Sequence, residues 1–326
     1  MPVLRREDST AAAPAPFVQD APPIARWAAR TRRHWDWARS GGVGRLIEED
    51  GLDPFARLTT AIAKRRWRRR HGVERGTARA VFVVGVQRSG TNMLVRGLEA
   101  APEVEVHNEN DRRAFARFLL RDDAVIAHLV ATSRHEVVLF KPLCDSHRVV
   151  DLLEGLGTPV PPLAIWAYRG VDGRVGSAVT KFGDVNLRVV RDIAAGRGGD
   201  RWQGQRVSGA TSDRLAQVDW DRATPATGAA AFWYLRNVLF FELGLDRRPD
   251  VWLASYESTV IAPQQSVREL CSFLGFRFHP RLAAHVDGRA AAPRRDDIDP
   301  VVRAWCDELQ DRLDAVVASR AAAPIG

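Results

Sequence analysis

The chain has few cysteines and no long apolar run. Its three cysteines, Cys144, Cys271 and Cys306, are widely spaced and form no C-x-x-C pair. This pattern excludes a disulfide framework and gives no sign of a zinc site, so we expect reduced, mostly buried thiols and no bound metal. No stretch of about 18 apolar residues occurs, and the first residues lack the apolar core of a signal peptide. A cytoplasmic location is therefore expected.

Strong net charge is also absent from most of the 326 residues. Residues 1–78 contain 16 Lys/Arg and 9 Asp/Glu, a net charge of +7, whereas residues 79–326 contain 32 and 31, a net charge of +1. A nearly neutral main region argues against nucleic acid as a partner. Any anion that this region binds must be held by a local cluster of cations.

Residues 1–78 are predicted to be an extension of a domain that spans 79–326. Residues 1–23 are rich in Ala and Pro and predict a disordered arm, whereas 24–40 and 54–70 predict helices. The second helix ends in a run of cations, Lys64, Arg65, Arg66, Arg68, Arg69 and Arg70. Two interpretations stay open: a solvated basic surface on a helix that docks on the main domain, or peripheral contact of residues 64–70 with an anionic membrane or an acidic substrate.

From residue 79 onward, short apolar runs alternate with helical patterns. The predicted strands are 80–86, 136–140, 162–168 and 250–256. The predicted helices lie near 91–99, 111–131, 144–154, 173–183, 226–243, 263–274 and 298–318. Such alternation is typical of a three-layer α/β/α fold with a central, mainly parallel sheet. Residues 184–223, rich in Gly and Arg, predict an insertion or lid, or contain a helix that the pattern does not reveal.

The segment VFVVGVQRSGTN, residues 81–92, combines an apolar strand with a glycine-containing loop. Gly85 and Gly90 permit a tight backbone, and successive N–H groups at the start of the next helix can cradle phosphate oxygens. Nucleoside triphosphatases place a lysine and a magnesium-binding Ser/Thr where this loop has Thr91 and Asn92. The loop is therefore P-loop-like, but a magnesium-dependent kinase is disfavoured. Arg88 supplies a cation suited to an oxyanion.

The stretch Val86-Gln87-Arg88-Ser89-Gly90-Thr91-Asn92 resembles the phosphosulfate loop of the sulfotransferases, which use 3′-phosphoadenosine-5′-phosphosulfate (PAPS). The departures are Gln87 for a usual proline and Asn92 for a second threonine. The resemblance implies that PAPS is the co-substrate and that no metal is needed. It assigns the 5′-phosphosulfate to Arg88, Ser89, Gly90, Thr91 and Asn92.

Two later segments extend the resemblance to about residues 80–280. Arg169 ends a predicted strand and Ser177 follows eight residues later, which is similar to the family's pair for the 3′-phosphate, although Gly170 replaces the usual acid. Lys181 is a candidate additional cation. Tyr256, in a Tyr-Glu pair, lies where relatives contact the nucleotide. A surface ion pair for Arg169 and a buried structural role for Tyr256 stay open as alternatives.

Sulfuryl transfer to a hydroxyl needs a base and a cation near the leaving oxygen. Glu109 follows Ala-Pro-Glu-Val in a stretch similar to that of the protein-tyrosine and glycan sulfotransferases, and this similarity implies that Glu109 is the base. His107 and Asp111 compete for this role, and Glu109 could instead be an ordinary acid at a helix start. Lys141 ends a predicted strand and is a candidate to stabilise the leaving oxygen, or a simple helix cap.

These patterns together predict a PAPS-dependent sulfotransferase that releases PAP, the desulfated product, and modifies an acceptor hydroxyl. The acceptor stays open among glycans, lipid headgroups, peptides and small molecules. A nucleotide or small-molecule kinase with a degenerate loop and a non-catalytic polyanion-binding protein are the alternative hypotheses.

Overall fold

The computed structural model describes residues 54–199, 201–288 and 290–322. The predicted arm 1–23 and helix 24–40 lie outside this range. By its contacts the chain divides into Met1–Leu58 and Thr59–Gly326. Apart from the first residues of helix α2, every element described below belongs to the second unit.

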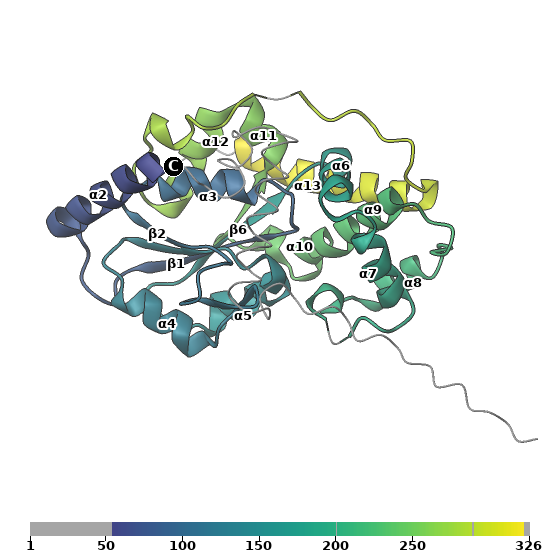
Figure 1. The fold of residues 1–326 in the computed structure, drawn as a ribbon, viewed down its shortest axis with the longest axis horizontal. Helices are drawn as coiled ribbons and strands as arrows, with labels where there is room; N and C mark the ends of the chain where they lie inside the picture. Colours follow the sequence, from purple (N-terminus) through teal and green to yellow (C-terminus); the bar gives the residue numbers. More distant parts are fainter. Residues whose placement is uncertain (1–53, 200, 289, 323–326) are drawn as a thin grey trace, which may run out of the picture. The chain divides into compact units, whose positions relative to one another are not determined.

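A five-stranded parallel sheet forms the centre of this unit (Figure 1). Its strands are β1 (Arg79–Gly85), β2 (Val104–His107), β5 (Val137–Phe140), β6 (Leu163–Tyr168) and β7 (Val251–Ser255), in the spatial order β2-β5-β1-β6-β7. Phe82 of β1 pairs with Phe140 on one side and with Ala164 on the other. The four predicted strands are confirmed, and β1 lies at the centre of the sheet.

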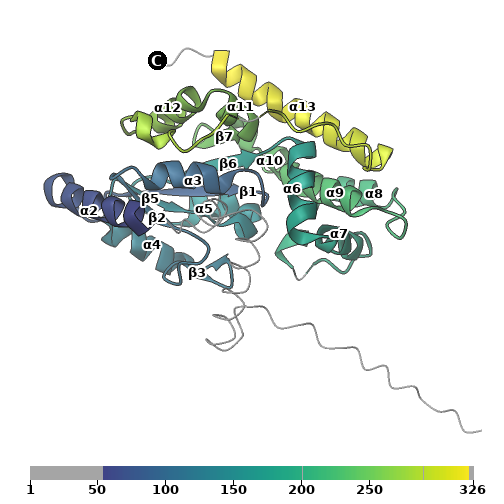
Figure 2. The same ribbon diagram turned by 45° about the horizontal axis from the view of Figure 1, so that its top comes forward.

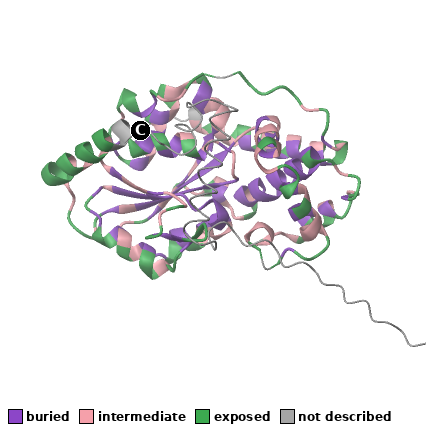
Figure 3. Ribbon diagram, in the orientation of Figure 1, coloured by how far each residue is buried: buried purple, intermediate pink, exposed green. Residues whose placement is uncertain are grey.

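Alternate residues of each strand pack into two separate cores, which gives the three layers. Val81 and Val83 face a core with α3 (Thr91–Glu99) and α12 (Pro263–Leu274), whereas Phe82 and Val84 face a core with α4 (Asp123–Thr132), α5 (Val149–Gly155) and α9 (Pro225–Asn237). Figure 2 shows α3 and α12 above the sheet, and in Figure 3 the strands are largely buried. The predicted α/β/α class is confirmed.

The remaining elements complete the unit. They are β3 (Phe115–Ala116) and β4 (Leu119–Leu120), helices α6 (Val171–Phe182), α7 (Val185–Ala194), α8 (Gly209–Leu215), α10 (Leu239–Glu242), α11 (Tyr256–Ile261) and α13 (Pro300–Ala322), and 3-10 turns η1 (Leu143–Arg148), η2 (Trp202–Gly204), η3 (Leu245–Arg247) and η4 (Pro280–Leu282). The segment 184–223 therefore contains two helices, α7 and α8.

Two predictions about residues 100–131 were wrong. Strand β2 was missed because it is an edge strand whose two central residues are only half-buried, so it lacks a continuous apolar run. The helix predicted for 111–131 begins only at Asp123, because residues 115–120 form the antiparallel β3–β4 hairpin. The apolar spacing of Phe115, Phe118 and Leu119 imitates a helical period over this short distance.

The basic helix α2 (Pro54–His71) confirms the helix predicted for 54–70. The side chain of Trp67 stacks on His135, with ring centroids 5.8 Å apart, and so links α2 to the segment before β5. Ile62 on the opposite side is 48% exposed, and Arg65, Arg66, Arg69 and Arg70 are exposed. Trp67 therefore contributes to the contact of α2 with the sheet domain, whereas the aliphatic side chain of Ile62 is exposed.

Gly228 marks the close approach of α7 and α9. A β-carbon at this position would collide with the backbone and Cβ of Leu187. We expect Gly228→Ala to destabilise the fold by about 1–3 kcal/mol and to lower the Tm by about 2–10 °C, because neither helix can yield without repacking. Thermal melting followed by circular dichroism measures this effect.

Gly209→Ala is the matched control for this prediction. Gly209 also lies in a helix, but the space around it is open to beyond 4 Å. An equal loss of Tm in both variants would show that the α7–α9 approach is not the cause.

Candidate functional site

The candidate site residues follow the carboxyl ends of the five parallel strands, which share one edge of the sheet. The loop 86–90 follows β1, Lys141 follows β5, and Arg169 follows β6. Tyr256 follows β7, and Glu109 lies two residues beyond β2. In open parallel sheets a ligand usually binds at this edge, at the point where the connections from two neighbouring strands run to opposite faces of the sheet. The strand order puts Glu109 and Lys141 on one side of the loop, and Arg169 and Tyr256 on the other.

The loop after β1 is held in an unusual backbone conformation. Gly85, Arg88 and Gly90 have positive φ values of 125°, 72° and 84°. Gly90 is the N-cap of α3, and its carbonyl accepts from the N–H groups of Met93 (2.9 Å) and Leu94 (3.2 Å). The free N–H groups of the first turn therefore point towards the loop, as an anion site requires.

Helix α6 fixes the loop at two successive residues. Arg88 donates from Nε to the hydroxyl of Ser177 (2.9 Å), and Arg174 donates from Nε to the carbonyl of Gln87 (3.3 Å). Arg174 is fully buried and also donates to the carbonyl of Ala229 (2.7 Å). These bonds stabilise the left-handed conformation of Arg88, which is costly for a residue with a β-carbon.

Arg169 and Tyr256 form the opposite wall of the loop. The guanidinium carbon of Arg169 lies 4.3 Å from the centre of the Tyr256 ring, and this ring packs on Gly90. The Nε of Arg169 and the hydroxyl of Ser89 are buried and have no hydrogen-bond partner among the described residues. Two unsatisfied donors beside a helix N-terminus suit a phosphorylated ligand, because its oxygens would complete their bonding.

Glu109, Lys141 and Asn92 form a polar cluster on the acceptor side. The ammonium of Lys141 donates to Oδ1 of Asn92 (2.7 Å) and lies 3.5 Å from Oε2 of Glu109. The side chain of Lys141 is only 8% exposed, and that of Glu109 is 19% exposed. Burial raises the pKa of Glu109 above the ordinary value of a glutamate, and the charge of Lys141 acts in the opposite direction. A carboxylate with a raised pKa is a stronger base than an exposed glutamate.

The competing bases are engaged elsewhere. His107 is fully buried, stacks on Phe140, and has Nδ1 2.8 Å from Asp111. Asp111 also accepts two short bonds from Arg113, at 3.0 and 2.7 Å. Burial acts to raise the pKa of Asp111, but the bonds from Arg113 outweigh burial, so this pKa lies well below the ordinary value. A carboxylate stabilised in this way is a weak base, which favours Glu109.

The contacts join the predicted site residues in three groups: Arg88 with Ser177, Arg169 with Tyr256 and Gly90, and Asn92 with Lys141 and Glu109. Ser89 and Thr91 are buried in the loop, and Lys181 lies one turn beyond Ser177 on α6. Two supporting residues were missed by the sequence reading. Arg174 lies on α6 between Arg169 and Ser177, and the hydroxyl of Ser146 accepts from the N–H of Gly85 (3.0 Å). Arg174 could have been noticed in the sequence, because it is an arginine at an otherwise apolar position of a predicted helix. No feature of the sequence indicated the role of Ser146.

Trp233 shows how the backbone beside Arg169 is held. Its indole Nε1 donates to the carbonyl of Arg169 (2.8 Å), and Glu257 accepts from the N–H of Gly170 (3.0 Å). Gly170 replaces an acid usual in the related pattern, and the carboxylate of Glu257 on helix α11 holds this turn instead. The turn after β6 therefore keeps defined hydrogen bonds despite the substitution.

The described residues contain no group of three or more His, Cys, Asp or Glu side chains placed to hold a metal ion. The three cysteines are free and buried, and burial raises the pKa of Cys144 to about 12. Among the helices that the structure describes, none is long and apolar enough to cross a membrane.

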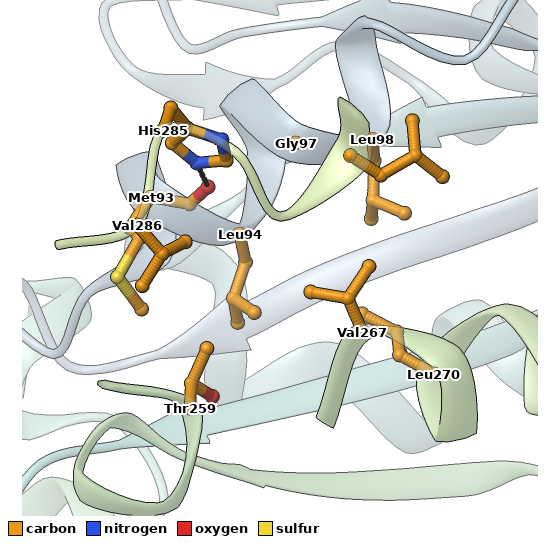
Figure 4. A pocket seen from close by; sticks show the side chains of 10 residues that line it. Met93, Leu94, Gly97, Leu98, Thr259, Val267, Leu270, His285 and Val286 are labelled. Carbon is orange, nitrogen blue, oxygen red and sulfur yellow. Dashed lines mark hydrogen bonds between the residues drawn. The ribbon is translucent and has the colours of Figure 1, made fainter. Parts of the chain in front are cut away.

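An apolar pocket lies behind the loop helix (Figure 4). Leu94 and Leu98 of α3 face Val267 and Leu270 of α12 across it. The ring of His285 closes one end and lies 2.8 Å from the carbonyl of Met93. The pocket presents few polar atoms and lies between α3 and α12, so it contributes to packing and not to the anion site.

Solved structures similar to this chain are sulfotransferases. The sulfotransferase domain from the curacin biosynthetic pathway is 14% identical, with a TM-score of 0.46, and covers 72% of this chain and 98% of its own. The sulfotransferase domain of the Synechococcus PCC 7002 olefin synthase is 15% identical (TM-score 0.35; 76% and 96% covered). Mouse sulfotransferase SULT7A1, complexed with PAP, is 14% identical (TM-score 0.38; 75% and 89% covered).

No protein-family model and no curated protein matches the sequence. The solved neighbours are distant, and their TM-scores are below 0.5, so the likeness to them carries no functional argument. The loop 86–90, the start of α3 and their contacts with α6, Tyr256 and Lys141 are what indicate a function.

Proposed function

We propose that this protein transfers a sulfuryl group from PAPS to an acceptor hydroxyl and releases PAP. The observation that carries this proposal is the loop after β1. It combines a helix N-terminus, the cation of Arg88 and the unsatisfied hydroxyl of Ser89, but it lacks a lysine and a magnesium-binding hydroxyl at the end of the loop. Such a loop suits a phosphosulfate, which needs no metal, better than a triphosphate with its magnesium ion.

The nucleotide side of the site would bind and orient the two charged ends of PAPS. The N–H groups of the first α3 turn, with Arg88 and Ser89, would hold the 5′-phosphosulfate. Arg169, whose Nε has no hydrogen-bond partner in the described part of the chain, would hold the 3′-phosphate together with Ser177. A hydroxyl that accepts from Arg88 can still donate its own proton to a phosphate oxygen. Lys181 would add a cation on the same helix.

The acceptor side would carry out the proton transfer. Glu109 would take the proton of the acceptor hydroxyl while its oxygen forms a bond to sulfur and the bond from sulfur to the phosphate oxygen breaks. The ammonium of Lys141 would stabilise the negative charge that develops on the phosphate oxygen, because it is nearly buried and strongly held. The electron pair leaves with PAP.

Titration calorimetry with PAP tests the proposal. We expect tight binding that is unchanged when Mg²⁺ is removed with a chelator, because the loop lacks the magnesium-binding hydroxyl and the described residues contain no group of three or more His, Cys, Asp or Glu side chains placed to hold a metal. Labelled PAPS then allows a screen of hydroxyl acceptors. Absence of PAP binding, or ATP turnover that requires Mg²⁺, would instead support the degenerate-kinase hypothesis.

The exposed arginines of α2 support a proposed contact between residues 64–70 and the negative charge of an acidic acceptor or an anionic surface. This contact is separate from the anion site at the sheet edge, which lies on different elements.

A further inference from the structure

Asn92 is the least expected residue of the loop, and its contacts give it a role. It is the second residue of α3 and is exposed, yet its side-chain oxygen accepts a 2.7 Å hydrogen bond from the nearly buried ammonium of Lys141. An exposed amide that binds a buried cation this closely holds the cation in one position, because a charge-assisted bond of this length is stronger than a neutral one.

Lys141 is thereby held between two acceptors. Its ammonium lies 2.7 Å from Asn92 but 3.5 Å from Glu109, so the contact to the carboxylate is an ion pair that is 0.8 Å longer than the bond to Asn92. Where the ammonium is nearly buried, a lysine and a glutamate would otherwise close to a short contact. A tightly paired glutamate binds an incoming proton less readily.

We propose that Asn92 is a positioning residue that holds the ammonium of Lys141 away from Glu109 and towards the loop. Glu109 then keeps the proton affinity that a base needs, and Lys141 stays close to the leaving oxygen. The kinetic part of this inference rests on the proposed sulfuryl transfer; the electrostatic part rests on the contacts alone. Through this single contact, Asn92 would set the distance between Lys141, which follows β5, and Glu109, which follows β2.

The charged groups around Glu109 define how this arrangement should respond. Burial raises the pKa of Glu109, Lys141 lowers it, and the carboxylate of Asp145 on η1 raises it. A bond from the N–H of Leu143 lowers it. Cys144, also on η1, stays a neutral thiol because burial raises its pKa to about 12. Lys141 is therefore the one cation that acts on Glu109 among these neighbours, and its position controls the pKa.

Two substitutions should move the pKa of Glu109 in opposite directions. Asn92→Ala releases the ammonium to pair closely with Glu109, so the pKa falls. Asn92→Asp attracts the ammonium and adds a negative charge nearby, so the pKa rises. We expect the acid limb of the pH profile of kcat to move down by about 0.5–1 pH unit in the first variant and up by a similar amount in the second.

The experiment measures both variants in two ways. Carboxyl NMR titration of ¹³C-labelled protein, assigned with Glu109→Gln, reads the pKa of Glu109 directly, and pH profiles with PAPS read its kinetic consequence. Asn92→Gln, which still offers an amide oxygen to Lys141, should keep most of the wild-type behaviour. Gln264→Ala is the matched control, because Gln264 is an exposed amide at the second position of α12.

The inference would be overturned if the pKa of Glu109 moved in the same direction in Asn92→Ala and Asn92→Asp, or if it did not move in either variant. A purely structural role for Asn92 would change the Tm and leave both titrations in place. The two failures are distinguishable: wild-type protein that does not bind PAP contradicts the proposed function, whereas the NMR titration still decides the role of Asn92.

Discussion

Glu109→Gln is expected to lower turnover by about 10²–10⁴-fold while leaving the affinity for PAP unchanged. The amide is nearly isosteric with the carboxylate, but it cannot accept the proton of the acceptor hydroxyl. The proposed nucleotide contacts lie on the loop itself and, on its other side, on Arg169 and Tyr256, so we expect them not to depend on the charge at residue 109. The loss should therefore appear in kcat and not in the dissociation constant of PAP.

Single-turnover transfer from labelled PAPS and calorimetry with PAP measure the two quantities on the same protein. Glu99→Gln is the matched control, because Glu99 lies exposed at the last turn of α3 and should keep wild-type turnover. Turnover near that of the wild type in Glu109→Gln would exclude Glu109 as the base. In that case His107 and Asp111, the competing candidates from the sequence, are the next residues to test.

The sheet could be predicted from the sequence because its strands are buried on both faces. Such strands are continuous apolar runs, and β1 and β6 read as Ala-Val-Phe-Val-Val and Leu-Ala-Ile-Trp-Ala-Tyr. The helix starts at Thr91 and Pro263 also agree with the prediction, because a glycine or proline precedes or begins each of them. Local composition is sufficient to predict a strand or helix where burial and the turn residues favour the same structure.

The edge of the sheet and the hairpin before α4 could not be predicted in this way. Strand β2 has partners on one side only, so Glu105 remains partly exposed and breaks the apolar pattern. The β3–β4 hairpin turns through Arg117 and Phe118, which both have positive φ values without being glycine. Nothing in the composition of this turn indicates that conformation. The N–H of Leu120, in the strand after the turn, donates to the carboxylate of Asp145, which is 25 residues further along the chain.

The candidate site was predictable in its residue types but not in its contacts. Chain order shows that Arg88 and Arg169 each follow a strand, and parallel strands bring such positions to one edge, whereas Ser177 lies in the middle of α6 and not at its start. It does not show that Lys141 bonds to Asn92, since 49 residues separate them. The proposed role of Asn92 depends on β1 and β5 being neighbours, and therefore on the sheet order.

Gly90→Ala is expected to weaken PAP binding by about tenfold or more and to lower turnover in parallel. Gly90 has φ +84°, where a β-carbon costs about 1–3 kcal/mol, and 1.4 kcal/mol corresponds to tenfold in affinity. The new β-carbon would also lie 2.5 Å from Cδ2 of Tyr256, so the ring must move away from the loop. That movement disturbs the stacking of Arg169 on the ring and hence the expected contact to the 3′-phosphate.

Gly155→Ala separates this local effect from a general effect of replacing glycine. Gly155 ends α5, has no positive φ, and has open space around its β-carbon position. It should keep wild-type PAP affinity and gain slightly in Tm, because alanine restricts the unfolded chain. If calorimetry finds Gly90→Ala binding PAP as tightly as Gly155→Ala, the loop does not form the nucleotide site. If Gly90→Ala loses affinity while its Tm falls only modestly, the packing of Tyr256 on Gly90 is what holds the loop ready for a phosphate.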